Sequence, residues 1–317
     1  MKKELSPIGA TCLLFVTAMI WGFAFAAQRA AGEAFGAFSI ICLRSVVAFL
    51  VLIPVVMVFD RLRGNGRRLF SLRAGRLALD VTRTEWTGGI LCGLALGVAS
   101  LLQQLGMQYN QSSGKTAFIT ALYVALVPLF GAFLGRRTGL FVWLGVLGSV
   151  GGAFLLAFDL AGGEQISLAL GDLLVLCCAA VFAVQILVID RFSPRCDGIR
   201  MSLIQFLTGA VITLPFMLLF EGGGLTAAAF MQGGLPLLYL GMMSSGVAYT
   251  LQILGQRDLN PAVASLIMCL ESVFSALGGW LLLHQNLSIR ESSGCVLLFA
   301  AVVLAQLPLG RLKRSKA

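Results

Sequence analysis

Long apolar stretches, separated by short polar segments, make up most of this 317-residue chain. A hydrocarbon core about 30 Å thick needs roughly 20 apolar residues as helix, because a helix satisfies its own backbone hydrogen bonds there. Segments of that size lie near residues 8–28, 36–59, 86–108, 114–135, 140–158, 171–190, 200–220, 233–254, 262–283 and 292–309. With 58% hydrophobic and 12% charged residues, the chain has too few polar side chains for a soluble surface. We therefore predict an all-α integral membrane protein of ten transmembrane helices.

The basic residues predict the orientation of these helices, since cytoplasmic loops carry an excess of Lys and Arg. With a cytoplasmic N-terminus, most of the 23 basic residues fall in inside segments, above all in the loop 60–85 and the tail 311–316. Acidic Asp159, Glu164 and Glu221 fall outside. We expect both termini in the cytoplasm of a multi-pass protein of the cell (plasma) membrane. The Arg-rich loop 60–85 is interpreted as solvated, with attachment to the inner leaflet as the alternative.

Cofactor and metal motifs are missing from the sequence. There is no GxxxxGK[ST] phosphate loop, no CxxC spacing among the eight cysteines, and one histidine, His284. These patterns argue against ATP-driven transport by this chain alone, a metal site or a histidine-dependent catalytic triad. We expect no cofactor, no metal and no nucleic-acid partner.

An internal repeat is present. Residues 97–106 (GVASLLQQLG) resemble residues 246–255 (GVAYTLQILG) at an offset of 149 residues, which pairs Gln103 with Gln252 and also Gly145 with Gly294. An odd number of predicted helices separates the copies, so the second half crosses the membrane in the opposite sense. We predict two inverted five-helix repeats, residues 1–160 and 161–317. Such repeats are typical of carriers that alternate between two states around a midplane site.

Several segments resemble one family of membrane proteins. These are MIWGFAFAAQRA (19–30), LRS (43–45), LQQLGMQYNQSSGKTAFITALYVALVPLFGAFLGRR (102–137) and LNPAVASLIMCLESVFSALGGWLLLHQ (259–285). The chain is identified by them as a ten-helix permease of the drug/metabolite transporter superfamily, EamA-type. The resemblance implies transport of small metabolites or drugs through a central cavity flanked by helices 1, 3, 4, 6, 8 and 9, with helices 5 and 10 peripheral.

Two positions depart from the family pattern. The usual Glu-Pro of the ninth helix is Glu271-Ser272 here, which predicts that the expected kink is missing, and the acidic residue common after that helix is Gln285.

Polar residues within the apolar segments are the candidates for a substrate pathway. Thr116, Thr120 and Tyr123 share one face of the fourth helix, and Ser245, Tyr249 and Gln252 share one face of the eighth. The predicted pathway residues are Trp21, Gln103, Thr120, Tyr123, Gln185, Ser245, Tyr249, Gln252 and Glu271. Single glutamines also bond helix to helix, and Trp21 is equally suited to core packing.

Two ionisable residues fall inside helices. Glu271 is near the middle of the ninth, where charged groups are costly and commonly face a cavity, so it is the candidate for proton coupling; a structural, hydrogen-bonded Glu is the alternative. Arg44 is suited to attract an anion, but we favour a structural role, reaching the outer headgroups. Lys115 and Arg29 are interpreted as outer-surface anchors.

Together these features predict a secondary transporter of small metabolites that works by alternating access, an exporter of amino acids or drugs by resemblance. The alternatives are an integral membrane enzyme acting on a lipid or isoprenoid, and a passive channel. We expect a small-molecule substrate and membrane lipid as partners, and a monomer or homodimer. The four glycines of the fifth helix favour packing within the protein over a dimer face.

Overall fold

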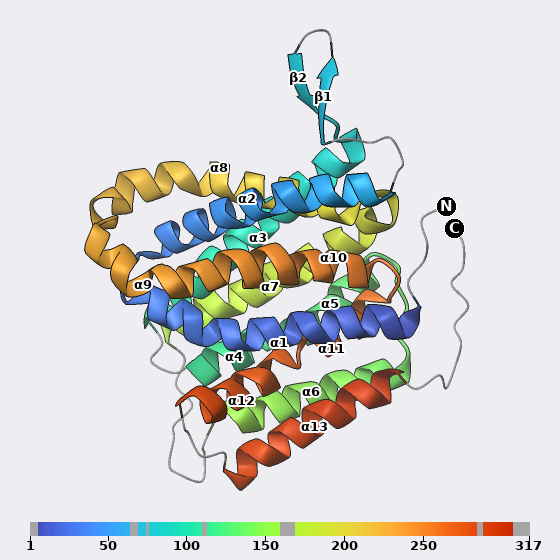
Figure 1. Ribbon diagram of the computed structural model, residues 1–317. Helices are drawn as coiled ribbons and strands as arrows, with labels where there is room; N and C mark the ends of the chain where they lie inside the picture. Colours follow the sequence, from blue (N-terminus) through green and yellow to red (C-terminus); the bar gives the residue numbers. More distant parts are fainter. Residues whose placement is uncertain are drawn as a thin grey trace.

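Membrane-length helices dominate the computed structural model, which describes residues 6–63, 69–73, 76–109, 113–158, 169–283 and 288–306 (Figure 1). Within these ranges ten helical spans are long and apolar enough to cross a membrane. The predicted count and fold class are confirmed. His284, Gln285, Asp159, Glu164 and the tail 311–316 lie outside the described residues.

Five of the spans are single α-helices, and a sixth is α7 (Leu170–Phe192) continued by the short 3₁₀ helix η1 (Ser193–Arg195). The ends of these six helices agree with the predicted segments to within a few residues. The other five are α1 (Pro7–Gly32), α2 (Ala37–Arg63), α3 (Arg83–Tyr109), α6 (Leu140–Ala157) and α13 (Ile289–Gln306).

The other four spans are composite. The fourth is α4 (Ser113–Ala121) with α5 (Tyr123–Phe133); the seventh is α8 (Gly198–Phe216) with the π-helical η2 (Met217–Glu221); the eighth is α9 (Ala227–Tyr239), the π-helical η4 (Leu240–Tyr249) and α10 (Thr250–Gln256); the ninth is α11 (Pro261–Met268) with α12 (Glu271–Leu283). Both π-helical stretches begin within a turn of a proline, Pro215 or Pro236. Proline lacks a backbone N–H and disturbs the regular hydrogen-bond ladder.

Local sequence explains where several helices begin. Ser6 caps α1 by accepting a hydrogen bond from the Gly9 N–H at 3.1 Å, with Pro7 at the first helical position. Asn260 caps α11 in the same way, accepting from Ala262 N–H at 2.9 Å, with Pro261 next. A polar cap followed by proline is a common helix start, because the first turn leaves N–H groups without partners.

The loop between α2 and α3 contains a short antiparallel hairpin that the sequence did not predict. Its strands are β1 (Phe70–Arg73) and β2 (Arg76–Leu79), with Phe70 paired to Leu79. It projects from the helical bundle beyond the end of α2 (Figure 1).

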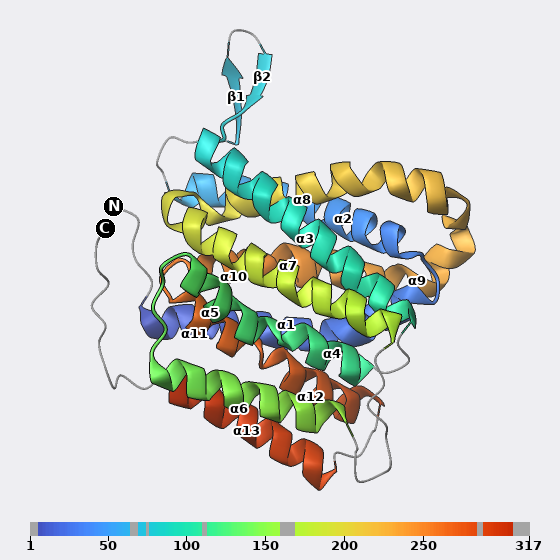
Figure 2. The same ribbon diagram turned by 180° about the vertical axis from the view of Figure 1, so that it is seen from behind.

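The two halves are interleaved. Helix α1 of the first half packs on α10 and α12 of the second, and α7 of the second half packs on α3 and α5 of the first (Figure 2). Repeat-related glycines make both contacts possible. A Cβ on Gly106 of α3 would lie 2.9 Å from the Gly171 carbonyl oxygen of α7, and one on Gly255 of α10 would lie 3.0 Å from the Ala10 carbonyl oxygen of α1. Successive spans run antiparallel and each half has an odd number of them, so the halves are inverted copies.

Helices α6 and α13 form a pair at one edge of the bundle (Figure 1). Their backbones approach closely, since a Cβ on Gly152 would lie 2.8 Å from the Gly294 carbonyl oxygen. The glycine-rich face of the fifth span therefore packs within the protein. The large side chains left uncovered on this pair, such as Leu147 and Val296, have the apolar character that a lipid-facing surface requires.

Candidate functional site

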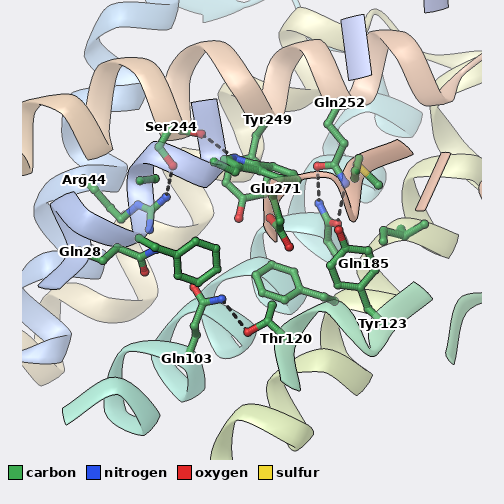
Figure 3. A pocket seen from close by; sticks show the side chains of 16 residues that line it. Gln28, Arg44, Gln103, Thr120, Tyr123, Gln185, Ser244, Tyr249, Gln252 and Glu271 are labelled. Carbon is green, nitrogen blue, oxygen red and sulfur yellow. Dashed lines mark hydrogen bonds between the residues drawn. The ribbon is translucent and has the colours of Figure 1, made fainter. Parts of the chain in front are cut away.

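A polar cavity lies at the centre of the bundle, between the two halves (Figure 3). Every predicted pathway residue except Ser245 lines it: Trp21, Gln103, Thr120, Tyr123, Gln185, Tyr249, Gln252 and Glu271. These side chains come from spans 1, 3, 4, 6, 8 and 9, the six that the resemblance implied. Thr116, which shares a helix face with Thr120, is buried but is not a lining residue.

The fourth and ninth spans are both interrupted beside this cavity. Helix α5 begins at Tyr123 after a break at Leu122, and α12 begins at Glu271 after a break at Cys269 and Leu270. Tyr123 and Glu271 are thus the first residues after the breaks in the repeat-related fourth and ninth spans, which lie within two residues of each other at the 149-residue offset, and both line the cavity. The expectation that Ser272 leaves the ninth helix without a kink is wrong.

No proline or glycine occupies either break, so the sequence carries no local signal for them. Interrupted helices inside a membrane occur where the freed backbone lines a cavity or is buried in protein. The helix breaks therefore lie beside the same cavity that the polar side chains line.

Arg44 of α2 also lines the cavity, with only 5% of its surface exposed. Its Nε donates to the Ser245 hydroxyl at 2.8 Å and its Nη2 to the Ser244 hydroxyl at 3.1 Å. The prediction that Arg44 reaches the outer headgroups is wrong, because its guanidinium is held inward by these serines. Ser245 is turned to Arg44, and Ser244 takes the expected place in the lining.

Trp21 and Tyr249 form an aromatic wall of the cavity. Their ring centroids are 4.6 Å apart, with the planes inclined by 52°. Trp21 Nε1 donates to the Ser244 carbonyl oxygen at 3.2 Å, a group in the π-helical η4. Trp21 therefore both lines the cavity and joins α1 to the eighth span.

The repeat-related glutamines Gln103 and Gln252 have different partners. Gln103 Nε2 donates to the Thr120 hydroxyl at 3.1 Å, whereas Gln252 pairs with Gln185. Thr120 corresponds at the 149-residue offset to Cys269, which offers a far weaker acceptor than a hydroxyl. The cavity is consequently asymmetric although its scaffold is repeated.

Three buried polar atoms around the cavity, Gln28 Oε1, Tyr123 Oη and Glu271 Oε1, make no well-formed hydrogen bond among the described residues. The Tyr123 hydroxyl and the Glu271 carboxyl nevertheless lie close enough to interact with each other. Buried polar groups are nearly always satisfied in native proteins, and exceptions need a reason such as a ligand or water. These three atoms are positioned to hydrogen-bond a polar solute.

The space between the lining side chains is small, about 30 Å³ for the centres of water-sized molecules. That volume accommodates only a few water molecules, since one needs about 10–15 Å³ on this measure. The structure is therefore a narrow form of the cavity, and a larger solute requires the surrounding helices to separate.

Gln28 and Arg44 were not in the predicted set. Gln28 had a usable signal, because Trp21, Ala24, Phe25 and Gln28 follow the i, i+3, i+4, i+7 spacing of one helix face and all four line the cavity. Arg44 had no such sequence signal, because the position of an arginine along a helix does not reveal which neighbouring residues accept its hydrogen bonds.

Buried charges join helix ends away from the cavity. Arg200, at the start of α8, pairs with Asp60 of α2 at 2.8 Å, and its side chain is 1% exposed. Asp197, which caps α8, also pairs with Arg63 of α2. This end carries the residues predicted to be cytoplasmic.

At the opposite end Lys115 pairs with Asp172 of α7 at 2.6 Å. Its side chain is only 16% exposed, so it joins two helices and does not serve as a free surface anchor.

Known proteins resemble this chain over most of its length. An uncharacterized transporter of Archaeoglobus fulgidus is 24% identical over 93% of this chain and 84% of the relative. The uncharacterized transporter YoaV of Bacillus subtilis is 24% identical over 75% of this chain and 82% of the relative. One solved crystal structure has the same fold, with a TM-score of 0.77 over 95% of this chain and 98% of that one, at 20% identity.

The family comparison covers both halves. The pattern of the EamA-like transporter family matches residues 8–158 and again residues 169–307. Together with the ten membrane-length spans, this decides the class of the protein: the chain belongs to the EamA-like transporter family and is a multi-pass membrane transporter.

Proposed function

We propose that this protein is a secondary carrier that moves a small organic metabolite across the cell membrane, with the central cavity as its substrate site. The observation that carries the proposal is the pair of helix breaks in the repeat-related fourth and ninth spans, each followed by a polar residue, Tyr123 or Glu271, that lines one shared cavity. Discontinuous helices at the interface of inverted repeats are how many secondary transporters build a midplane site.

Transport proceeds by alternating access in this proposal. The two halves rock about the cavity and open it to one side at a time. The narrow cavity supports this, because a substrate of more than a few water molecules' volume has to be admitted by movement of the lining helices. The buried charge pairs at the two ends, Asp60 with Arg200 and Lys115 with Asp172, join helices that such a movement separates.

The direction is export, and the substrates are metabolites such as amino acids, or drugs. Glu271 couples this export to protons, since its carboxyl group lines the cavity and its Oε1 makes no well-formed hydrogen bond among the described residues. In the orientation predicted from the basic residues, both termini are cytoplasmic, and the hairpin β1–β2 lies on the cytoplasmic side.

A metabolite screen tests the proposal. Cells lacking the protein, cells overproducing it, and cells overproducing the double variant Tyr123→Phe/Glu271→Gln are compared for internal and external amino acids, nucleobases and organic acids. We expect overproduction to lower the internal level of one solute class and raise it outside, and the double variant to match cells lacking the protein. Leu218→Ala, a change at a side chain 59% exposed on the seventh span, is the control and retains the effect.

Two outcomes would reject the proposal. Identical solute levels in all strains would remove the export function. A change confined to lipid or isoprenoid intermediates would favour the membrane-enzyme alternative.

A further inference from the structure

The guanidinium of Arg44 is buried without an ion pair among the described residues. No described carboxylate lies within 4.0 Å of its nitrogens, and its hydrogen-bond acceptors are the neutral hydroxyls of Ser244 and Ser245. The other deeply buried arginine, Arg200, pairs with Asp60. Burying a guanidinium without an opposite charge is costly in a membrane protein, and such residues commonly mark a substrate path.

The geometry leaves part of the guanidinium available to a ligand. The two serines accept from Nε and from Nη2, whereas a guanidinium has five N–H groups arranged as a planar fork. That fork matches the two oxygens of a carboxylate. Figure 3 shows Arg44 at one side of the cavity, with Ser244 beside it and the Gln185–Gln252 pair on the opposite side.

We propose that Arg44, held by Ser244 and Ser245, forms a subsite for the carboxylate of the transported solute. The inference rests on the proposed function, because it assigns a part of the substrate to a part of the same cavity. It narrows the substrate class to small organic solutes that carry one carboxylate.

The charges of the cavity favour a carboxylate over a phosphate. One guanidinium neutralises one negative charge, whereas a phosphate monoester carries close to two at neutral pH. The second negative charge would have no cation to pair with, because Arg44 is the only Lys or Arg among the described lining residues. The rest of the lining includes Phe25, Phe182 and Met268, which suit the apolar body of the solute.

The fluorescence of Trp21, which lines the cavity, can report solute binding. Trp21 is one of four tryptophans, and the others, Trp86, Trp143 and Trp280, do not line the cavity. Replacing those three by Phe leaves Trp21 as the single tryptophan. Its emission then reports solute binding to the purified protein in lipid nanodiscs at pH 7.

The probes are 4-methylpentanoate and 4-methylpentanamide, which have nearly the same shape and differ in charge. We expect the carboxylate to bind at least about tenfold more tightly than the amide, as charge-assisted hydrogen bonds to a buried guanidinium imply. In Arg44→Gln the two probes bind equally. Arg44→Lys keeps the positive charge but loses the planar guanidinium, so we expect its preference for the carboxylate over the amide to be intermediate.

A matched control changes a neutral group on the other side of the cavity. Gln185→Met is expected to alter the affinity for both probes by the same factor, so that the carboxylate preference persists. Thermal unfolding of each variant identifies those that are misfolded. If Arg44→Gln does not fold, the relative affinity of the protein that retains Arg44 for the carboxylate and the amide still tests the proposal.

Each result has a distinct meaning. Equal binding of the two probes to the Arg44 protein, or a preference that persists in Arg44→Gln, would overturn the carboxylate subsite and make Arg44 a structural residue while the cavity remains a solute site. No response of Trp21 to either probe would overturn the subsite and the proposed substrate cavity together.

Discussion

The side-chain amides of Gln185 and Gln252 are hydrogen-bonded to each other in both directions. Gln252 Nε2 donates to Gln185 Oε1 at 3.2 Å, and Gln185 Nε2 donates to Gln252 Oε1 at 3.4 Å. Both residues are buried and line the central cavity, one from α7 and one from α10. The pair closes one side of the cavity.

Removing one glutamine of this pair leaves the other without its hydrogen-bond partner. Gln185→Leu leaves the Gln252 amide buried without its partner, which costs about 1–3 kcal/mol, and the double variant Gln185→Leu/Gln252→Leu recovers part of that loss. A double-mutant cycle of unfolding in detergent should give a coupling energy of about 0.6 kcal/mol, and up to about 1.7. Strictly additive effects would show that the two amides do not stabilise each other.

Glu271→Gln removes the only carboxyl group among the described lining residues of the cavity while preserving its shape. In proteoliposomes we expect wild-type flux to respond to an imposed proton gradient and to external pH, and Glu271→Gln flux to be insensitive to both. Glu291→Gln makes the same chemical change at the start of α13, away from the cavity, and should retain the wild-type response. An unchanged pH profile in Glu271→Gln would end the proton-coupling hypothesis.

Arg200→Met breaks a buried ion pair and leaves the carboxylate of Asp60 uncompensated. Such changes destabilise proteins by about 3–5 kcal/mol. Arg137→Met removes an arginine from the exposed turn between the fourth and fifth spans, so we expect a loss within about 1 kcal/mol. Chemical unfolding in detergent compares the two, and losses of similar size would contradict a structural role for the buried pair.

Gly106→Ala and Gly255→Ala place a methyl group within 3.0 Å of backbone carbonyl oxygens on α7 and α1. Because backbone cannot move aside cheaply, each should lose about 1–3 kcal/mol of stability. Gly97→Ala is the matched control, since its Cβ meets nothing within 4 Å, and alanine favours a helix over glycine by up to about 1 kcal/mol. A loss of stability in Gly97→Ala equal to the other two would mean that close helix contact is not the cause.

Impermeant thiol labelling tests the proposed orientation. All eight cysteines are free thiols, so the experiment needs a cysteine-free background with one new cysteine at an exposed loop position. Thr226→Cys, in the turn between the seventh and eighth spans, should be labelled in intact cells. Arg137→Cys, between the fourth and fifth, should be labelled only after the membrane is opened. The reverse pattern would place the termini outside.

The sequence predicted most of the fold because the membrane imposes strong local rules. A backbone in hydrocarbon has to satisfy its own hydrogen bonds, so apolar length alone located the ten spans. The 149-residue offset then predicted that the halves are inverted copies. Gly106 and Gly255, which this offset pairs, make corresponding close contacts with a neighbouring helix. The candidate site was also largely predicted, since Gln103, Tyr123 and Glu271 are expensive in lipid and were expected to face a cavity.

Tertiary structure decided the rest. The breaks before Tyr123 and Glu271 contain no proline or glycine, so the residues at the breaks do not reveal them. The same is true of Arg44: its sequence position allowed both an inward and an outward side chain. Only the placement of Ser244 and Ser245 on a π-helical segment of the eighth span held the guanidinium inside, because a buried hydrogen-bonding group adopts the direction in which its partners lie.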